Sequence, residues 1–182
     1  MLSTFVVHVE NKPGVLTRVA SLFRRRTYNI ESLTVGRTEK PEISRMTIVV
    51  DIAEDAAPGV EANLYKLFNV LFVENITSEP SVFRDLAVIK VSANEASRPH
   101  LMDLIRVFRA RILDVAPESL IIEITGTEDK INGLLEVLRP YGVLEMVRTG
   151  RIGMRRGSET SGARTSSTIL EPVPREDITF SI

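Results

Sequence analysis

Hydrophobic residues change their spacing near the start of the chain. Phe5, Val7 and Val9 lie at every second position, which is typical of a β-strand, and Pro13-Gly14 then supplies turn chemistry. From Val15 to Phe23 the apolar residues recur at helical spacing. The pattern predicts a strand that passes through a tight turn into an amphipathic helix.

The pattern beyond this helix completes one small domain. Two strands joined by a polar loop suggest a hairpin, and a helix and a closing strand follow. The predicted strands are 29–36, 45–50 and 73–76, and the predicted helix carries Val60, Leu64, Leu67, Phe68 and Leu71. The order β-α-β-β-α-β is that of a ferredoxin-like domain.

The second half of the chain repeats this order. Leu16, Val19 and Phe23 have counterparts in Leu101, Leu104 and Phe108. We expect strands at 86–91, 111–115, 120–124 and 143–147, with helices over 101–109 and 131–138. The predicted fold class is α+β, with two ferredoxin-like βαββαβ domains in tandem, over 1–79 and 80–157, and a polar tail over 158–182.

The first turn carries the candidate chemistry. The first N–H groups of a helix lack intrahelical acceptors and lie at the positive end of its dipole, so they favour a carboxylate. Gly14 has no side chain to exclude a ligand, and Asn11 and Asn29 each offer a neutral amide. The second half has Asn94 to His100 in place of this turn, without a glycine. The turn can hold an amino acid, although an Asn-X-Pro-Gly run also occurs as an ordinary helix-capping turn.

Other kinds of site have little support. Glu10 and Glu31 flank the region from Asn11 to Asn29 as solvated strand-end charges, and Ser32 and Ser44 lack an obvious activating histidine. We therefore expect no catalytic residues. Cysteine is absent and the two histidines, His8 and His100, are far apart, so no metal site is expected.

Charge and composition exclude further classes. The net charge is −1, and no apolar run reaches the length of a membrane span. We interpret Arg24 to Arg26 as cations at a helix end, and Arg148, Arg151, Arg155 and Arg156 mainly as a solvated face. Neither nucleic acid nor a membrane is an expected partner, and a cytoplasmic location is the default. For Ile169 to Ile182 we expect a weak docking strand, on this chain or on a partner.

Three segments carry a resemblance to a known family. The runs 11–16, 28–36 and 44–49 resemble the N-terminal ACT domain of the small regulatory subunit of acetolactate synthase, also called acetohydroxyacid synthase. The runs 112–115, 123–126 and 148–150 resemble the C-terminal domain of that family. The similarity spans about residues 1 to 157, and the tail departs from the usual short ending.

The resemblance implies a regulatory role without catalysis. It implies a subunit that activates a large catalytic subunit and relays feedback inhibition by valine in branched-chain amino-acid biosynthesis. Thiamine diphosphate, Mg and FAD are expected in that large subunit, and no cofactor is expected in this chain. A stand-alone amino-acid sensor acting on a different partner is the alternative.

The resemblance also implies where the effector binds. ACT domains pair side by side as a homodimer, with effector at the interface. One protomer would contribute Asn11, Gly14, Val15 and Leu16, and the other would contribute Asn29 and Ile30. We further expect the hairpin from Arg37 to Arg45 to contact the large subunit, because it is charged and lies between two diagnostic strands.

Overall fold

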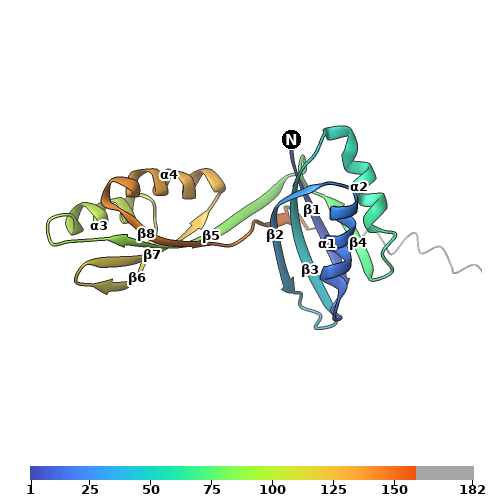
Figure 1. The fold of residues 1–182 in the computed structure, drawn as a ribbon, viewed down its shortest axis with the longest axis horizontal. Coiled ribbons are helices and arrows are strands. Elements are labelled where there is room, and N and C mark those ends of the chain that lie inside the picture. Colours follow the sequence, from blue (N-terminus) through green and yellow to red (C-terminus); the bar gives the residue numbers. More distant parts are fainter. Residues whose placement is uncertain (159–182) are drawn as a thin grey trace, which may run out of the picture.

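The computed structural model describes residues 1–158, and these form two domains joined by a narrow connection (Figure 1). The first domain contains β1 (Leu2–Glu10), α1 (Val15–Arg25), β2 (Asn29–Arg37), β3 (Ile43–Asp51), the 3-10 turn η1 (Glu54–Ala56), α2 (Ala57–Leu64) and β4 (Val70–Asn75). Its sheet has the order β2-β3-β1-β4, with antiparallel neighbours. This arrangement is the βαββαβ fold that the sequence predicts.

The first sheet is buried on the face that carries the helices. Phe5, Val7 and Val9 point toward α1 and α2, where they pack with Val19 and Phe23. These residues are at most 1% exposed. The alternation in β1 and the helical spacing in α1 therefore build one core.

The second helix is shorter than its hydrophobic pattern predicts. The predicted helix extends to Leu71, but α2 ends at Leu64 and Leu71 lies in β4. The backbone carbonyl of Asn69 accepts a hydrogen bond from Glu10 at 2.9 Å, and Val70 pairs with Val9. Pairing with β1 therefore begins three residues before the predicted strand.

The second domain repeats the architecture. It contains β5 (Ser81–Ser92), α3 (Arg98–Val107), β6 (Arg111–Ala116), β7 (Ser119–Gly126), α4 (Glu128–Leu138), the 3-10 turn η2 (Arg139–Tyr141), β8 (Val143–Arg148) and β9 (Ile152–Arg155). The sheet order is β6-β7-β5-β8, and β9 pairs with β5 outside this path. Ala87, Ile89 and Val91 of β5 point into its core, against Leu101 and Leu134 of the helices.

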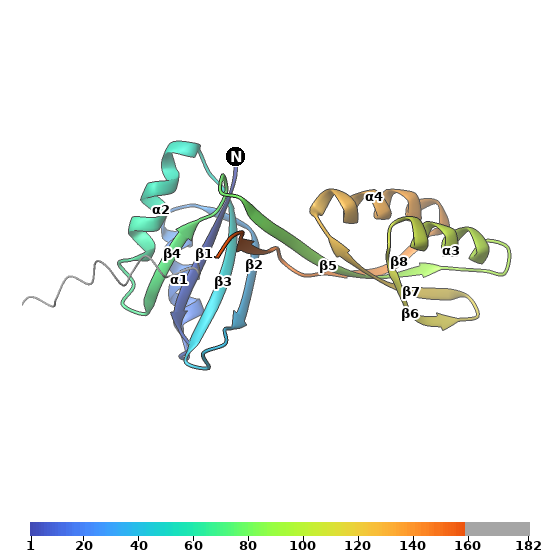
Figure 2. The same cartoon turned by 180° about the vertical axis from the view of Figure 1, so that it is seen from behind.

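The connection between the domains is a two-stranded ribbon (Figure 2). β5 begins at Ser81 rather than at the predicted Leu86, and its first four residues pair with β9, which the sequence pattern did not predict. β9 has only four paired residues, and a strand of this length is too short to show a hydrophobic period in the sequence. We call residues 81–84 with 152–155 the ribbon.

The ribbon covers the helix-free face of the first sheet. Gly153 lies so close to that sheet that an added Cβ would come within 2.7 Å of Ile76. Val6 and Thr47, which point away from the helices, are 0% and 4% exposed. The helices therefore bury one face of the first sheet, and the other face is buried at Val6 and Thr47.

The expected docking strand at Ile169 to Ile182 lies outside the described residues. Among the residues that the structure describes, no helix has the length and apolar character needed to cross a membrane.

Candidate functional site

The turn between β1 and α1 has the geometry of an open helix start. Gly14 precedes the helix in the left-handed region, with φ of 82°, and no side chain caps the first turn. A Cβ at Gly14 would meet nothing within 4 Å. The N–H of Val15 makes only a long hydrogen bond to the carbonyl oxygen of Lys12, at 3.4 Å. The first N–H groups of α1 are therefore approachable, and they can donate to a carboxylate.

Asn11 fixes this turn to the neighbouring hairpin. Its side-chain Nδ2 donates to the carbonyl oxygen of Pro41 at 2.9 Å, and its backbone N–H donates to Glu42 at 2.7 Å. The Asn11 side chain is exposed, and its amide oxygen has no hydrogen bond within the described chain. That oxygen can accept from a ligand ammonium group.

The two residues after Gly14 have different surroundings. Val15 is 4% exposed and packs in the core, so only its backbone can serve a ligand. Leu16 is 43% exposed and points outward. An apolar ligand side chain beside the turn would meet Leu16.

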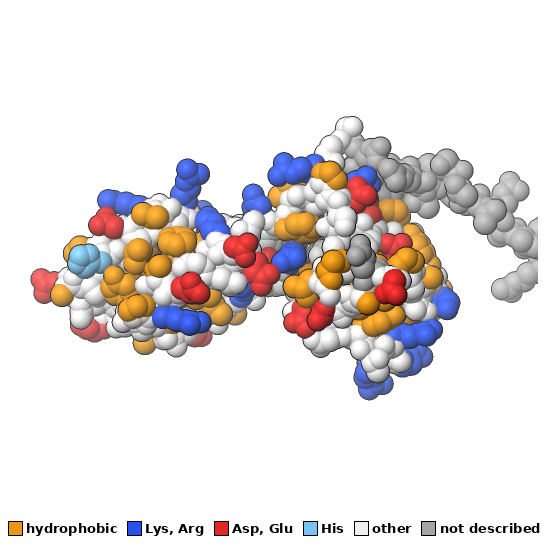
Figure 3. Space-filling view, turned by 90° about the horizontal axis from the view of Figure 1, so that it is seen from above, with side chains coloured by type: hydrophobic (Ala, Val, Ile, Leu, Met, Phe, Trp, Pro, Cys, Tyr) orange, Lys and Arg blue, Asp and Glu red, His pale blue; other side chains and the backbone are white. Residues whose placement is uncertain are grey.

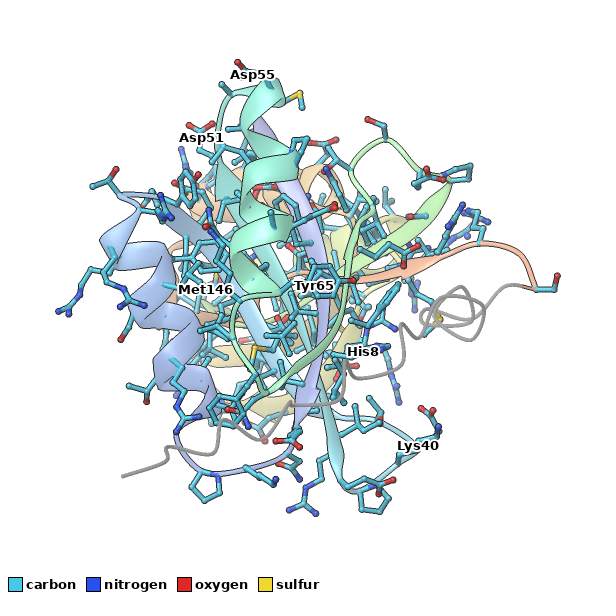
Figure 4. All side chains as sticks on the ribbon, turned by 90° about the vertical axis from the view of Figure 1, so that its right-hand side faces the viewer. His8, Lys40, Asp51, Asp55, Tyr65 and Met146 are labelled. Atoms are coloured by element: carbon cyan, nitrogen blue, oxygen red, sulfur yellow. The ribbon has the colours of Figure 1, made fainter. Side chains whose placement is uncertain are left out.

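Asn29 and Ile30 lie at the opposite end of the same sheet. Asn29 pairs with Asp51, whereas Asn11 lies beyond the pairing of Glu10 with Ile43. Figure 4 shows Asp51 and Lys40, which mark these two ends, on opposite sides of the domain. At about 3.3 Å per residue, the length of β1 separates the two groups by about 26 Å. A single chain therefore does not bring Asn29 to Asn11.

The charged side chains next to the turn, Lys12 and Glu10, already form contacts within the chain. Lys12 forms a salt bridge with Glu10 at 3.2 Å, and the Asn69 amide donates to the Glu10 carboxylate at 2.6 Å. The hydrogen bond from Asn69, followed by that from Lys12, lowers the pKa of Glu10. Glu10 is therefore ionised near neutral pH and is poorly suited to act as a general base.

The two arginines of the hairpin differ in their contacts. Arg37 is exposed at the end of β2. Arg45 is half-buried, and its guanidinium donates to the carbonyl oxygen of Gly153 in the ribbon. Burial lowers the pKa of Arg45, and Glu74 and Glu39 oppose this shift. Arg45 therefore takes part in a contact between the hairpin and the ribbon.

A cluster of arginines begins at the last residue of β8. The sequence pattern predicted a solvated face for this cluster, and that prediction is wrong for three of its members. Arg148 pairs with Asp85, Arg151 pairs with Glu128 at 2.8 Å, and Arg155 pairs with Glu74 and Glu79 at 3.0 Å. Figure 3 shows charged side chains of both signs at the waist between the domains. Their regular occurrence after the last predicted strand was a signal in the sequence that they act together. Their acidic partners lie far away in the sequence, so the pattern could not identify the ion pairs.

The backbone joins the domains at a second point. The N–H of Arg151 donates to Ser32 Oγ at 2.8 Å. A Cβ on Gly150 would lie 2.6 Å from Thr34 Oγ1 and 2.8 Å from the carbonyl oxygen of Leu33. The chain at 150 therefore approaches β2 as closely as only glycine permits.

The fold and the open turn define an ACT-domain protein with a second ferredoxin-like domain. Residues 5–72 match a family model described as an "AHAS small subunit-like ACT domain". Residues 84–157 match one described as "Small subunit of acetolactate synthase". The two matches correspond to the two sheets of the structure.

Relatives along nearly the whole described chain give the same family. A probable acetolactate synthase small subunit of Archaeoglobus fulgidus is 50% identical over 159 residues, which are 87% of this chain and 99% of that relative. The acetolactate synthase small subunit of Mycolicibacterium smegmatis is 46% identical over 160 residues, covering 88% of this chain and 94% of that relative. The crystal structure of the small subunit from Thermotoga maritima is similar, with a TM-score of 0.82 and 37% identity, over 87% of this chain and 99% of that chain. The chain belongs to the acetolactate synthase small-subunit family.

Proposed function

We propose that this chain is the noncatalytic regulatory subunit of an acetolactate synthase. In this role it activates the large catalytic subunit and makes that subunit sensitive to feedback inhibition by valine. Family membership supports the regulatory role. The main observation in support of a valine site is the open helix start at Gly14. It lies at the same end of the sheet as Arg37, the exposed last residue of β2.

The proposed site is completed by a second copy of the chain. β2 is an edge strand, and among the described strands it pairs only with β3. If two β2 strands pair antiparallel around a two-fold axis, the start of one strand lies beside the end of the other. Arg37 at the end of β2 pairs with Ser44, which pairs with Val9 close to Asn11. Asn29 and Ile30 of the partner would then reach the end of the sheet that carries Asn11.

The chemistry of this site fits an α-amino acid. The carboxylate would accept hydrogen bonds from the N–H groups after Gly14, where the helix dipole favours negative charge. The ammonium group would donate to the Asn11 amide oxygen and to an amide of the partner subunit. Leu16, which is 43% exposed, would contact the branched side chain.

The proposed inhibition requires that valine bind one conformation of the complex better than another. Asn11 is hydrogen-bonded to the hairpin through Pro41 and Glu42. A ligand held by Asn11 would therefore act directly on residues 37–45. Arg37 at the exposed end of this hairpin is our candidate for contact with the large subunit. The acetolactate synthase reaction itself would take place in the large subunit, with the thiamine diphosphate, Mg and FAD expected there.

Reconstitution with candidate large subunits tests the regulatory role. We expect the purified chain to raise the acetolactate synthase activity of its large subunit, and valine to reduce that activity. The Arg37→Ala variant should weaken activation while leaving valine binding intact. If the chain neither copurifies with nor activates a large subunit, but still binds valine, the stand-alone sensor is the better description.

Calorimetric titration tests the valine site itself. Asn11→Ala should weaken valine binding by about one to two decades, because a hydrogen bond to a charged group contributes about 1.5–3 kcal/mol. Asn94→Ala is the matched control, since Asn94 precedes the first helix of the second domain and accepts a hydrogen bond from Ser97 at 2.8 Å. Equal valine affinities in the two variants would rule out the assigned site.

A further inference from the structure

A cavity lies between the first sheet and the ribbon, away from the turn at Gly14. Its volume is about 340 Å³. The sheet contributes residues of β2 and β3, and the ribbon contributes residues of β5 and β9. The lining residues are Thr34, Gly36, Arg37, Arg45, Thr47, Val82, Arg84, Ile152, Gly153 and Met154.

The ribbon gives this cavity an apolar wall. The strand register pairs Val82 with Met154 and Arg84 with Ile152, so these four side chains share one face of the ribbon. Ile152 and Met154 are 53% and 62% exposed. Such exposure of neighbouring large apolar side chains beside a cavity is a feature of ligand-binding and interaction sites.

Two guanidinium groups, those of Arg45 and Arg84, lie beside the apolar wall. Arg37 lines one edge of the cavity, but it pairs with Ser44, so its side chain starts from the other face of β2. None of Arg37, Arg45 and Arg84 forms a salt bridge with a described carboxylate. Arg84 donates to the carbonyl oxygen of Phe83 at 2.7 Å, and Arg45 donates to that of Gly153. Each therefore has a backbone contact that positions it and N–H groups left over for another acceptor.

Arg45 makes an anion favourable at this place. It is half-buried, and burial is the main reason that its pKa is lowered. The charges of Glu74 and Glu39 oppose this shift without reversing it. A half-buried cation is costly to keep out of water, and a carboxylate bound in the cavity would reduce that cost further. An apolar wall with cations along one side suits a ligand that has a carboxylate at one end of a hydrocarbon body.

We propose that this cavity binds an amphipathic monocarboxylate that carries no ammonium group. Its carboxylate lies between Arg45 and Arg84, and its hydrocarbon body lies against Val82, Ile152 and Met154. The volume is at the lower end of the range for small-molecule sites, which occur preferentially between domains. The proposal does not depend on the valine site, because the cavity lies on the helix-free face of the sheet.

The arginines also exclude an amino acid from this cavity. The ammonium group of leucine would lie close to the guanidinium groups of Arg45 and Arg84, and no carboxylate lines the cavity to receive it. Three ligands with the same branched hydrocarbon body and different charged groups therefore test whether the cavity selects a carboxylate without an ammonium group. The probes are 4-methylpentanoate, leucine and 4-methylpentylamine.

The binding experiment uses the full chain with methyl-labelled methionine. We expect saturable binding of 4-methylpentanoate, with a chemical-shift change at the Met154 methyl and little change at Met146, which lies in β8 outside the ribbon. The amine should not bind. Leucine should bind at least tenfold more weakly than 4-methylpentanoate in an Asn11→Ala background, in which the proposed effector site is disabled.

A matched pair of substitutions locates the ligand. Gly36 lines the cavity beside Arg45, its register partner, and a Cβ added there meets nothing within 4 Å. Gly36→Leu should therefore fold and fill the cavity, and 4-methylpentanoate binding should be lost. Gly59→Leu places the same side chain on α2, where a Cβ is equally unobstructed, and it should bind as the unmodified protein does.

A substitution of Arg84 tests how much positive charge contributes to binding of the carboxylate. Arg84→Gln removes an exposed guanidinium and should weaken 4-methylpentanoate binding by about fivefold or more without loss of folding. The proposal is overturned if no saturable binding is seen, if the amine binds as well as the carboxylate, or if Gly36→Leu leaves the affinity unchanged. None of these results bears on valine binding, which Asn11→Ala reports separately.

Discussion

Asp85 and Arg148 connect the two chain segments that run between the domains. Arg148 donates to Asp85 Oδ2 from Nε at 3.1 Å and again from Nη2, and its Nη1 reaches Asn132 at 3.0 Å. Asp85 is 6% exposed, in the middle of β5. A buried carboxylate thus holds the end of β8 against the strand that enters the second domain.

Removal of the arginine should destabilise the protein. Arg148→Met leaves the Asp85 charge buried without its partner, and breaking a buried pair typically costs about 3–5 kcal/mol. Arg148 retains partial exposure, so we expect a loss near about 3 kcal/mol in urea unfolding followed by circular dichroism. Arg106→Met is the control, because its pair with Asp103 is long, at 3.9 Å, and exposed. The control should change stability by less than about 0.5 kcal/mol. Similar losses in both variants would contradict this account.

Alanine at Gly14 and at Gly59 should have effects of opposite sign. Gly14 has φ of 82°, and a left-handed conformation costs a residue with a side chain about 1–2 kcal/mol. Gly59 lies inside α2 with open space around its Cβ position, and alanine is favoured there by up to about 1 kcal/mol. Thermal unfolding should therefore show a lower midpoint for Gly14→Ala and a higher or equal one for Gly59→Ala. Equal shifts in the same direction would refute the role of φ.

The hydrophobic pattern predicts most of the fold because short-range spacing decides it. Both βαββαβ units follow from periodicity, as in β1 and α1. The prediction is wrong at the end of α2, where Leu67, Phe68 and Leu71 continue a helical spacing that the pairing of Val70 with Val9 overrides. Such pairing joins residues remote in sequence, so periodicity within a window of 11–18 residues does not report it.

The candidate site was predictable only in part. The Pro13-Gly14 turn has a local signature, and the structure gives Gly14 the positive φ that such a turn requires. The partners of Arg148, Arg151 and Arg155 lie in other segments, and no local pattern identifies them. The prediction that Asn11 and Asn29 share a site between two protomers stays a prediction.

His8 should make the protein less stable at mildly acidic pH. Its ring packs against Phe72 with centroids 5.8 Å apart, and burial, followed by the charge of Arg45, lowers its pKa. Glu39 and Glu74 oppose the shift but do not reverse it. Because the folded state binds the proton less readily than the unfolded state, stability falls as the pH decreases below about 6.5.

A histidine substitution measures this contribution. His8→Phe keeps an aromatic ring beside Phe72 and removes the titrating group. The loss of thermal stability between pH 7.5 and pH 5.5 should be smaller in His8→Phe than in the unmodified chain. His100→Phe changes an exposed histidine in the other domain and is the control. A pH dependence that is unchanged in His8→Phe would show that other groups cause it.

The close approach of Gly150 to β2 provides a way to loosen the contact between the domains without altering the proposed valine site. An alanine there would place its Cβ 2.6 Å from Thr34 Oγ1, and the carbonyl oxygen of Leu33, at 2.8 Å, is backbone that cannot rotate away. The chain at 150 must move, which also breaks the 2.8 Å hydrogen bond from Arg151 to Ser32. Overpacking of this kind typically costs about 1–3 kcal/mol.

Gly150→Ala should therefore separate valine binding from valine inhibition. We expect hydrogen exchange at residues 150–155 to accelerate, and valine affinity by calorimetry to stay within about twofold of the unmodified chain, because the turn at Gly14 is on a different part of the sheet. If the ribbon carries the signal between the domains, the reconstituted enzyme should need at least tenfold more valine for half inhibition. Gly36→Ala is the control, since it adds a Cβ to β2 with nothing within 4 Å. Unchanged inhibition in Gly150→Ala, together with faster exchange, would mean that the hairpin alone transmits the effect of valine to the large subunit.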